Sequence, residues 1–186
     1  GNPLEIACSA DAPLVAQVFK TVADPFIGKL SYIKVAAGTM TAGMEVVNMA
    51  SGQTEKVGKL VYMRGKKQEE AQKVVAGDIA AAAKMNAATG DTLCAGTAVT
   101  LERTEYDAPC YSMAVMPKAK GDESKIAQGI LRLLEEDASL SFTNNAETHQ
   151  QVITGLGEQH LDVVAAKLKS KFGADVTMEP PIVAYR

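Results

Sequence analysis

Glu158 and His160 are the residues whose types and spacing most invite a chemical interpretation. A carboxylate and an imidazole close together can act as a general acid–base pair or as metal ligands. These two lie two positions apart at the expected start of a helix, and residues two apart do not share a helix face. No nearby serine, cysteine or carboxylate completes a site. We therefore expect no catalytic residue and no metal site, with Glu158 at the positive end of the helix and His160 packed at a domain edge.

Phosphate binding is the second candidate chemistry. The pattern Gly-x-x-x-x-Gly-Lys-Ser/Thr occurs nowhere in the sequence. The Gly-Lys pairs at 28–29, 58–59 and 65–66 lack both the earlier glycine in register and the following hydroxyl residue. We expect these residues not to hydrolyse GTP by themselves, and we expect no cofactor bound to them.

Basic residues on two turns are the third candidate. The turn at 24–29 contains proline and glycine, and the segment at 64–67 is a basic loop. Charge runs usually face solvent, and on charge alone a solvated hairpin tip is the favoured interpretation. The alternative is binding to RNA phosphates, which needs flexible cations on protruding turns. The candidate RNA-binding residues are Lys29, Arg64, Lys66 and Lys67.

Length and composition limit the class of protein. The 186 residues allow one large domain or two small ones. No apolar run approaches the roughly 18 residues of a membrane span, and no signal-peptide layout opens the chain, so we expect a cytoplasmic protein. Cys8, Cys94 and Cys110 fit neither a disulfide framework nor a zinc site. Because the formal net charge is −3, a nucleic-acid partner must be bound by a local basic patch.

The second half of the chain, residues 109–186, is predicted to form a ferredoxin-like domain. Its expected elements are a strand at 110–116, a helix that Asp122 can cap, a strand at 139–143, a turn at Asn144-Asn145, a strand at 150–154, a helix ending at Gly173 and a strand at 174–178. This βαββαβ order is that of a ferredoxin-like α/β sandwich. The expected apolar stripes are Ile126, Ile130, Leu133 and Leu134 in the first helix and Leu161, Val164, Ala165, Leu168 and Phe172 in the second.

The first half, residues 13–102, is predicted to form a small closed β-barrel, because short strands alternate with glycine-containing turns. Residues 1–12 and 103–108 are expected to be linkers. The expected strands are 14–20, 30–37, 44–49, 55–63, 74–80 and 88–93. The Gly-Asp pairs at 77–78 and 90–91 are expected to be tight turns, 68–73 either one helical turn or a strand lead-in, and the alanine-rich 80–88 a strand and loop.

Two groups of motifs resemble a known family. The string Gly-Leu-Gly-Glu-Gln-His-Leu-Asp at 155–162, with Leu-Lys-Ser-Lys-Phe-Gly at 168–173 and Pro-Pro-Ile-Val-Ala-Tyr-Arg at 180–186, resembles the third domain of elongation factor G, the GTPase that drives ribosomal translocation. Asp-Pro-Phe-x-Gly-Lys-Leu at 24–30, Ala-Gly-Asp-Ile-Ala at 76–80 and Thr-Gly-Asp-Thr-Leu at 89–93 resemble the second domain, in the expected order. Departures at 64–67, 86–88 and 137–139 also fit a divergent paralogue.

The resemblance implies a function for the chain. It would be the ribosome-docking and signal-relay part of a translational GTPase, whose preceding domain would bind GTP and Mg²⁺. It implies that the basic turns meet small-subunit ribosomal RNA and protein, and that the third domain faces the GTPase switch region beside a groove that accepts fusidic acid. We expect a monomer. The residues matching that groove are Pro109, Gly155, Gly157, His160 and Val164.

Gly155 and Gly157 lie in the turn between the strand at 150–154 and the second helix. They are expected to allow its backbone conformation, with a positive φ at one or both. His160 is expected to present its side chain to the neighbouring domain. The rival class is a stand-alone, acylphosphatase-like enzyme on the same scaffold. Such an enzyme needs an arginine in an anion-binding loop beside the first strand, where Pro117-Lys118-Ala119-Lys120 offers only lysines.

Overall fold

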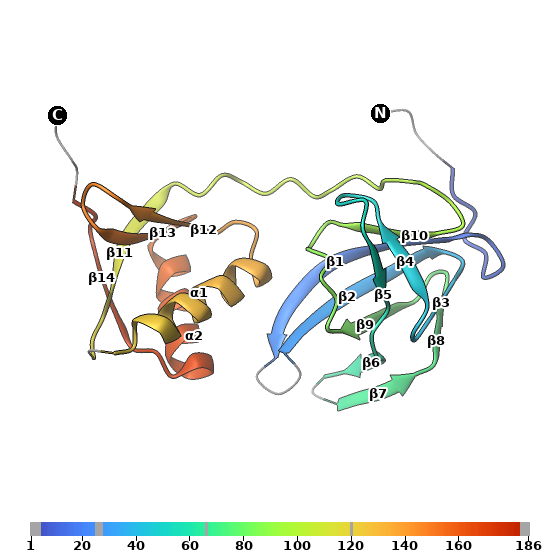
Figure 1. Ribbon diagram of the computed structural model, residues 1–186, viewed down its shortest axis with the longest axis horizontal. Coiled ribbons are helices and arrows are strands. Elements are labelled where there is room, and N and C mark those ends of the chain that lie inside the picture. The colour runs from blue at the N-terminus through green and yellow to red at the C-terminus, as the bar shows by residue number, and fades with distance from the viewer. Residues whose placement is uncertain (1–4, 25–27, 66, 120, 183–186) are drawn as a thin grey trace. The chain divides into compact units, whose positions relative to one another are not determined.

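The computed structural model describes residues 5–24, 28–65, 67–119 and 121–182. The chain divides into two compact units, Gly1–Thr104 and Glu105–Arg186. Each unit has its own sheet and its own hydrophobic core, as Figure 1 shows for the strand-rich first unit and the mixed second unit. The units are described one at a time below.

Antiparallel strands make up the first unit. Their bounds are β1 (Leu14–Asp24), β2 (Gly28–Ala37), β3 (Thr39–Thr41), β4 (Glu45–Asn48), β5 (Thr54–Lys56), β6 (Leu60–Arg64), β7 (Lys67–Ala71), β8 (Lys73–Val75), β9 (Ile79–Ala83) and β10 (Thr92–Ala95). The described residues form an eight-stranded sheet in the order β5-β4-β10-β1-β2-β9-β6-β7 and a two-stranded sheet, β3-β8. This arrangement confirms the predicted β-barrel type.

One hydrophobic core fills the barrel. It joins Val46 of β4, near one end of the strand order, to Ala71 of β7 at the other end. A flat sheet would keep residues from opposite edges apart, so the sheet must curl around this core. Val18 of β1 and Ile33 of β2 lie at its centre and are almost fully buried. Burial of this apolar surface is the main stabilising term for the unit.

Two segments outside the strands cover an outer face of the barrel. Residues 5–12 form an amino-terminal strap, which Gly38 N and Thr39 Oγ1 hold by donating to the carbonyl oxygens of Ser9 and Ala10 at 2.8 Å each. Residues 97–103 form a carboxy-terminal strap. Apolar residues of both straps pack against the same buried cluster, which comprises Val15, Ala37 and Cys94. Residues 5–12, expected to be part of a linker, are therefore packed against the barrel.

The second unit has the predicted βαββαβ order, which confirms the ferredoxin-like prediction. Its elements are β11 (Tyr111–Pro117), α1 (Glu123–Glu136), β12 (Ser141–Asn145), β13 (Gln150–Gly155), α2 (Glu158–Phe172) and β14 (Val176–Glu179). The sheet order is β12-β13-β11-β14, all antiparallel. Both helices lie on one face of this sheet (Figure 1), and their buried stripes share a core with Val115 and Ile153.

Several strand boundaries in the barrel differ from the prediction. The expected strand at 55–63 is two strands, because the chain between β5 and β6 passes so close to Ala83 that a Cβ on Gly58 would collide with the Ala83 carbonyl oxygen. The helical alternative for 68–73 is wrong, since β7 pairs with β6 through five residues from Ala71 to Lys67. The tight turn expected at Gly77-Asp78 is present, with a φ of 93° at Gly77, and it divides the stretch 74–80 between β8 and β9.

Local signals at the ends of elements in the second unit had mixed outcomes. Gly173 adopts the left-handed conformation (φ 64°) and ends α2 as predicted. Asp122 precedes α1 but makes no side-chain capping bond; its Oδ1 instead accepts from Lys125 Nζ at 2.8 Å. The turn expected at Asn144-Asn145 is wrong, because both residues belong to β12. The turn follows, with Asn145 Oδ1 accepting from Glu147 N at 2.9 Å.

Candidate functional site

His160 lies at the centre of a hydrogen-bond network in the second unit. Its Nδ1 accepts from the backbone N–H of Leu156 at 3.1 Å, so in the neutral ring the proton is on Nε2. Nε2 lies 2.9 Å from Asp137 Oδ2. The other oxygen, Asp137 Oδ1, accepts from Ser139 Oγ at 2.6 Å and from Ser139 N at 2.9 Å. A carboxylate and a serine therefore lie beside His160, although the sequence indicated neither.

The network holds the Asp137 carboxylate in its charged form. Partial burial alone would raise the pKa of Asp137, but hydrogen bonds from Ser139 and His160 outweigh it and hold that pKa below its ordinary range. The three residue types are those of a hydrolase triad, but the order of contacts is different. Ser139 donates to the carboxylate and both ring nitrogens of His160 have other partners, so no base is available to activate the hydroxyl.

The two glycines of the turn before α2 have different roles from those expected. Neither lies in the left-handed region that favours glycine. Gly157 is extended, with φ 175°, and a Cβ there would meet no atom within 4 Å. Gly155 is constrained by packing instead. A Cβ on it would lie 2.9 Å from Leu161 Cδ2 and 3.0 Å from His160 Nδ1. The position that requires glycine is therefore Gly155, and the reason is close packing.

The other residues matched to the fusidic-acid-type groove differ in exposure. Pro109 is half-buried in the segment before β11, next to Cys110, whose N–H donates to Gly155 O at 2.9 Å. Val164 is 2% exposed and belongs to the hydrophobic core. Leu156, which the sequence did not single out, is 46% exposed between the two glycines. The exposed apolar side chain of this turn is therefore that of Leu156.

The basic residues do not form one patch. Arg64 and Lys67 face each other across the β6–β7 hairpin, and both pair with Glu69, at 3.1 Å and 3.7 Å. Lys66 lies outside the described residues, as do 25–27 of the turn at 24–29. Lys29 lies elsewhere. Its carbonyl oxygen accepts from Lys84 N, just after β9, and this end of β9 pairs with the start of β6, whereas Arg64 is at the other end of β6.

Lys29 belongs instead to a second basic group, the lysine corner, formed by Lys29, Lys59 and Lys84. Backbone hydrogen bonds bring its members together: Lys84 N donates to Lys29 O, and Ala83 N donates to Lys59 O, both at 3.0 Å. Beside it is a pocket of about 490 Å³ with an apolar floor of Leu30, Val61 and Ala83. Sequence inspection missed Lys59 and Lys84 because only strand register places them beside Lys29.

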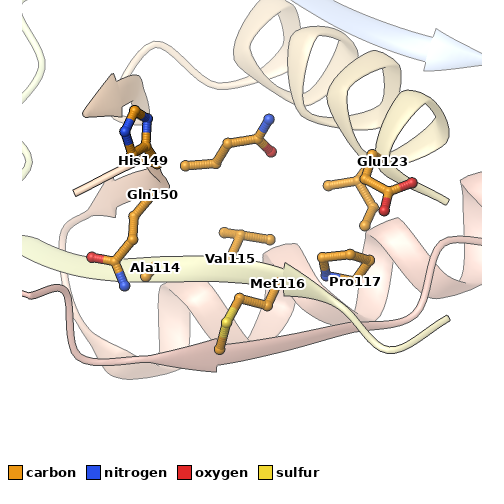
Figure 2. A pocket seen from close by; sticks show the side chains of 9 residues that line it. Ala114, Val115, Met116, Pro117, Glu123, His149 and Gln150 are labelled. Atoms are coloured by element: carbon orange, nitrogen blue, oxygen red, sulfur yellow. The ribbon is translucent and has the colours of Figure 1, made fainter. Parts of the chain in front are cut away.

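A second pocket, of about 310 Å³, lies at the end of β11, where the rival acylphosphatase-like enzyme would bind its anion. Figure 2 shows β11 side chains from Ala114 to Pro117 along it, with Glu123 and His149 on opposite sides. Glu123 brings negative charge, and Lys118 is drawn to Asp175 Oδ1 at 3.2 Å. Hydrogen bonds from Lys169 and Lys118 hold the pKa of Asp175 below its ordinary range. The residues described around this pocket give no support for the rival enzyme, and Lys120 of the predicted anion loop lies outside the described residues.

Neither metal nor membrane chemistry is indicated in the part of the chain that the structure describes. No three His, Cys, Asp or Glu side chains there are grouped so that they could hold an ion. No described helix is long and apolar enough to cross a membrane.

The barrel and the ferredoxin-like sandwich each match a family model of a translation factor. Residues 13–96 match the family model described as elongation factor G domain 2. Residues 107–180 match the model described as elongation factor G, domain III. The chain belongs to the elongation factor G family and carries these two domains.

Two relatives agree with this assignment. Elongation factor G from Fervidobacterium nodosum is 37% identical over 188 residues, covering 100% of this chain and 27% of the relative. A crystal structure of a protein from Thermus thermophilus superposes with a TM-score of 0.80 at 28% identity, covering 93% of this chain and 26% of that one. The chain thus spans about a quarter of the length of each.

Proposed function

We propose that these two domains dock an elongation factor G-type GTPase on the ribosome and relay the state of its nucleotide domain during translocation. The partners would be small-subunit ribosomal RNA and protein on one side and the parent's own GTPase domain, with GTP and Mg²⁺, on the other. The protein would act as a monomer in the cytoplasm. The observation that carries the proposal is the match of both units, in order, to the second and third domains of the family.

The RNA-facing part of the proposal assigns phosphate contacts to Lys29, Arg64, Lys66 and Lys67. The Arg64 and Lys67 side chains are 75% and 77% exposed, and their pairs with Glu69 are surface ion pairs. Such pairs contribute little free energy, about 0–1 kcal/mol. These cations can therefore exchange the carboxylate for an RNA phosphate at small cost, with release of counterions from the RNA.

The switch-facing part assigns the partner contact to the turn that contains Gly155, Leu156 and Gly157, with Pro109 and Val164 supporting it. His160 holds this turn by accepting from Leu156 N, and Asp137 in turn orients the ring. An exposed leucine on a fixed turn suits contact with a neighbouring domain, because little conformational entropy is lost on binding. His160 would then be a positioning residue, and the groove beside the turn would be the fusidic-acid-type site.

Salt-dependent ribosome binding tests the RNA-facing part. In a full-length elongation factor G containing these residues, Arg64, Lys66 and Lys67 are replaced together by alanine. The log–log slope of affinity against salt should fall by up to about three units. The matched control removes the same charge from Lys20, Lys34 and Lys73, which are exposed on other strands. Equal slopes for the two triple variants would show that the hairpin cations only face solvent.

A further inference from the structure

We propose that the pocket at the lysine corner binds an unpaired nucleotide of RNA, with the base on the apolar floor and phosphates at Lys29, Lys59 and Lys84. The proposal rests on the RNA-docking function above and gives it a specific site. The hairpin cations would hold the RNA backbone without regard to sequence, whereas this pocket would select an extruded base.

The lysines are held together by the framework of the barrel. They come from the start of β2, the segment before β6 and the segment after β9, and two backbone hydrogen bonds join these segments. Lys84 has a φ of 59°, which is uncommon for a residue other than glycine. This conformation turns the chain at the end of β9. Strand register therefore places the three residues next to one another in the backbone, and two of them, Lys59 and Lys84, line the pocket.

The pocket has the size and lining that a base requires. Its volume of about 490 Å³ lies within the range of small-molecule sites, roughly 300–1,000 Å³. Leu30 and Val61 belong to an apolar cluster with Tyr32 and Met63, separate from the main core. Gln68 also lines the pocket, and its amide can donate to and accept from the edge of a base.

Two of the residues that line the pocket, Lys59 and Lys84, carry positive charge, and the nearest carboxylates are those of Glu70, on Lys59, and of Glu55, which accepts from Asn86 N at 2.9 Å. Lys84 forms no ion pair with any residue that the structure describes. Lys59 pairs with Glu70 at 2.8 Å, but both side chains are more than half exposed, so a phosphate can replace this carboxylate. Lys29 Nζ donates to a neutral acceptor, Asn86 O, at 3.2 Å.

A nucleotide fits this arrangement better than an acidic peptide does. A nucleotide has a planar base with a largely apolar face and, apart from it, a charged phosphate. The pocket likewise has an apolar floor and, apart from it, the lysines. Glutamate and aspartate have a charge but little apolar surface, so they would leave the floor unfilled. Single-stranded and bulged RNA is commonly recognised by bases that leave the stack.

The test uses the 186-residue chain and three RNA hairpins of one sequence: fully paired, with one bulged adenosine, and with an abasic bulge. Fluorescence anisotropy gives each affinity. The adenosine bulge should bind about 5-fold or more tightly than the abasic bulge, as expected for one stacked base. Ala83→Leu, which fills the floor, should remove this preference without changing the salt slope. If Ala83→Leu does not fold, Gln68→Leu removes the amide that would bond the base edge and should reduce the preference for the adenosine bulge.

Charge variants test the phosphate contacts. Replacing Lys29, Lys59 and Lys84 by glutamine should lower the salt slope by about two units, at about 0.7 for each single-strand contact. Lys84→Asn removes one charge and keeps a residue that tolerates the left-handed conformation. The matched control is the glutamine triple at Lys20, Lys34 and Lys73, which should leave the base preference unchanged.

The outcomes separate this proposal from the docking function. Equal affinity for the adenosine and abasic bulges, with salt-dependent binding to all three hairpins, would overturn the pocket and leave RNA docking in place. No binding to any hairpin would overturn both. A competition experiment tests the acidic-peptide alternative. Polyglutamate and the abasic-bulge RNA, added at equal total charge, are each used to displace the adenosine-bulge RNA. If polyglutamate displaces it equally well, the pocket accepts acidic protein segments and the nucleotide proposal is wrong.

Discussion

His160 Nε2 and Asp137 Oδ2 lie 2.9 Å apart, although the two residues are 23 positions apart in the sequence. Asp137 directly follows α1, and His160 is in the first turn of α2. The contact therefore joins the end of one helix to the start of the other. Because His160 Nδ1 also accepts from Leu156 N, the same ring holds the turn after β13.

His160→Ala should destabilise the second unit. The substitution leaves Leu156 N–H without its acceptor and removes a hydrogen bond from the Asp137 carboxylate, a loss of about 1–3 kcal/mol. Thermal unfolding of the chain, with hydrogen exchange at α2 amides to identify the unit, measures the effect. This corrects the expectation that the histidine matters only to a neighbouring domain. An unchanged exchange rate in α2 would contradict the network's structural role.

Gly155→Ala and Gly157→Ala form a matched pair. The first places a Cβ within 3.0 Å of Leu161 and His160, whereas the second places it in open space. Gly155→Ala should cost about 1–3 kcal/mol as overpacking. Gly157→Ala should lie within about 0.5 kcal/mol of the parent, as a surface substitution does. Urea unfolding compares the two, and a larger loss for Gly157→Ala would restore the backbone role expected for that glycine.

Asp137 should make the second unit sensitive to acid. Its folded pKa is lowered, so the unfolded chain binds more protons in the acid range. The stabilisation is complete above the unfolded pKa, about 3.9, and is lost as the pH falls through the folded value. The stability difference between the parent and Asp137→Asn should therefore be constant above about pH 5 and shrink below about pH 4. A difference that grows on acidification would contradict the assigned direction.

The two helices are also joined by a buried carboxylate. Glu136, at the end of α1, has a side chain only 7% exposed and binds Lys171 at 2.8 Å and Lys167 at 3.4 Å. Replacing both lysines by alanine removes two cationic partners from a buried carboxylate and should cost about 3 kcal/mol. Lys125→Ala, which breaks the exposed pair with Asp122, is the control and should cost at most about 0.5 kcal/mol. Similar melting temperatures for the two variants would refute the difference.

Patterns in the sequence predicted the helices and strands better than they predicted contacts between residues. The 3.6-residue spacing from Leu161 to Phe172 identified α2, and Gly173 marked its end, because both signals are local. The alanine-rich segment at 80–88 was correctly expected to be a strand and loop, since turn residues flank it. The break between β5 and β6 was missed because Gly58 is required by its approach to Ala83, which only the folded barrel brings near.

The sites show the same limit. Nothing local to His160 indicates Asp137, and nothing local to Lys29 indicates Lys59 or Lys84. Strands β12 and β13 separate Asp137 from His160 along the chain. Lys29, Lys59 and Lys84 are also far apart in the sequence, and only the pairing of β2, β9 and β6 brings them together. Resemblance to the family supplied residues at the turn, but it did not separate exposed Leu156 from buried Val164.

The two straps determine how force would pass through the barrel. Ile6 and Ala12 of one strap and Val99 and Leu101 of the other rest on the same buried cluster. A pull along the chain would enter and leave the barrel at this one place, so the tension would bypass most of its strands. The barrel would then behave as a rigid body, and the straps would peel from it before its sheet opened.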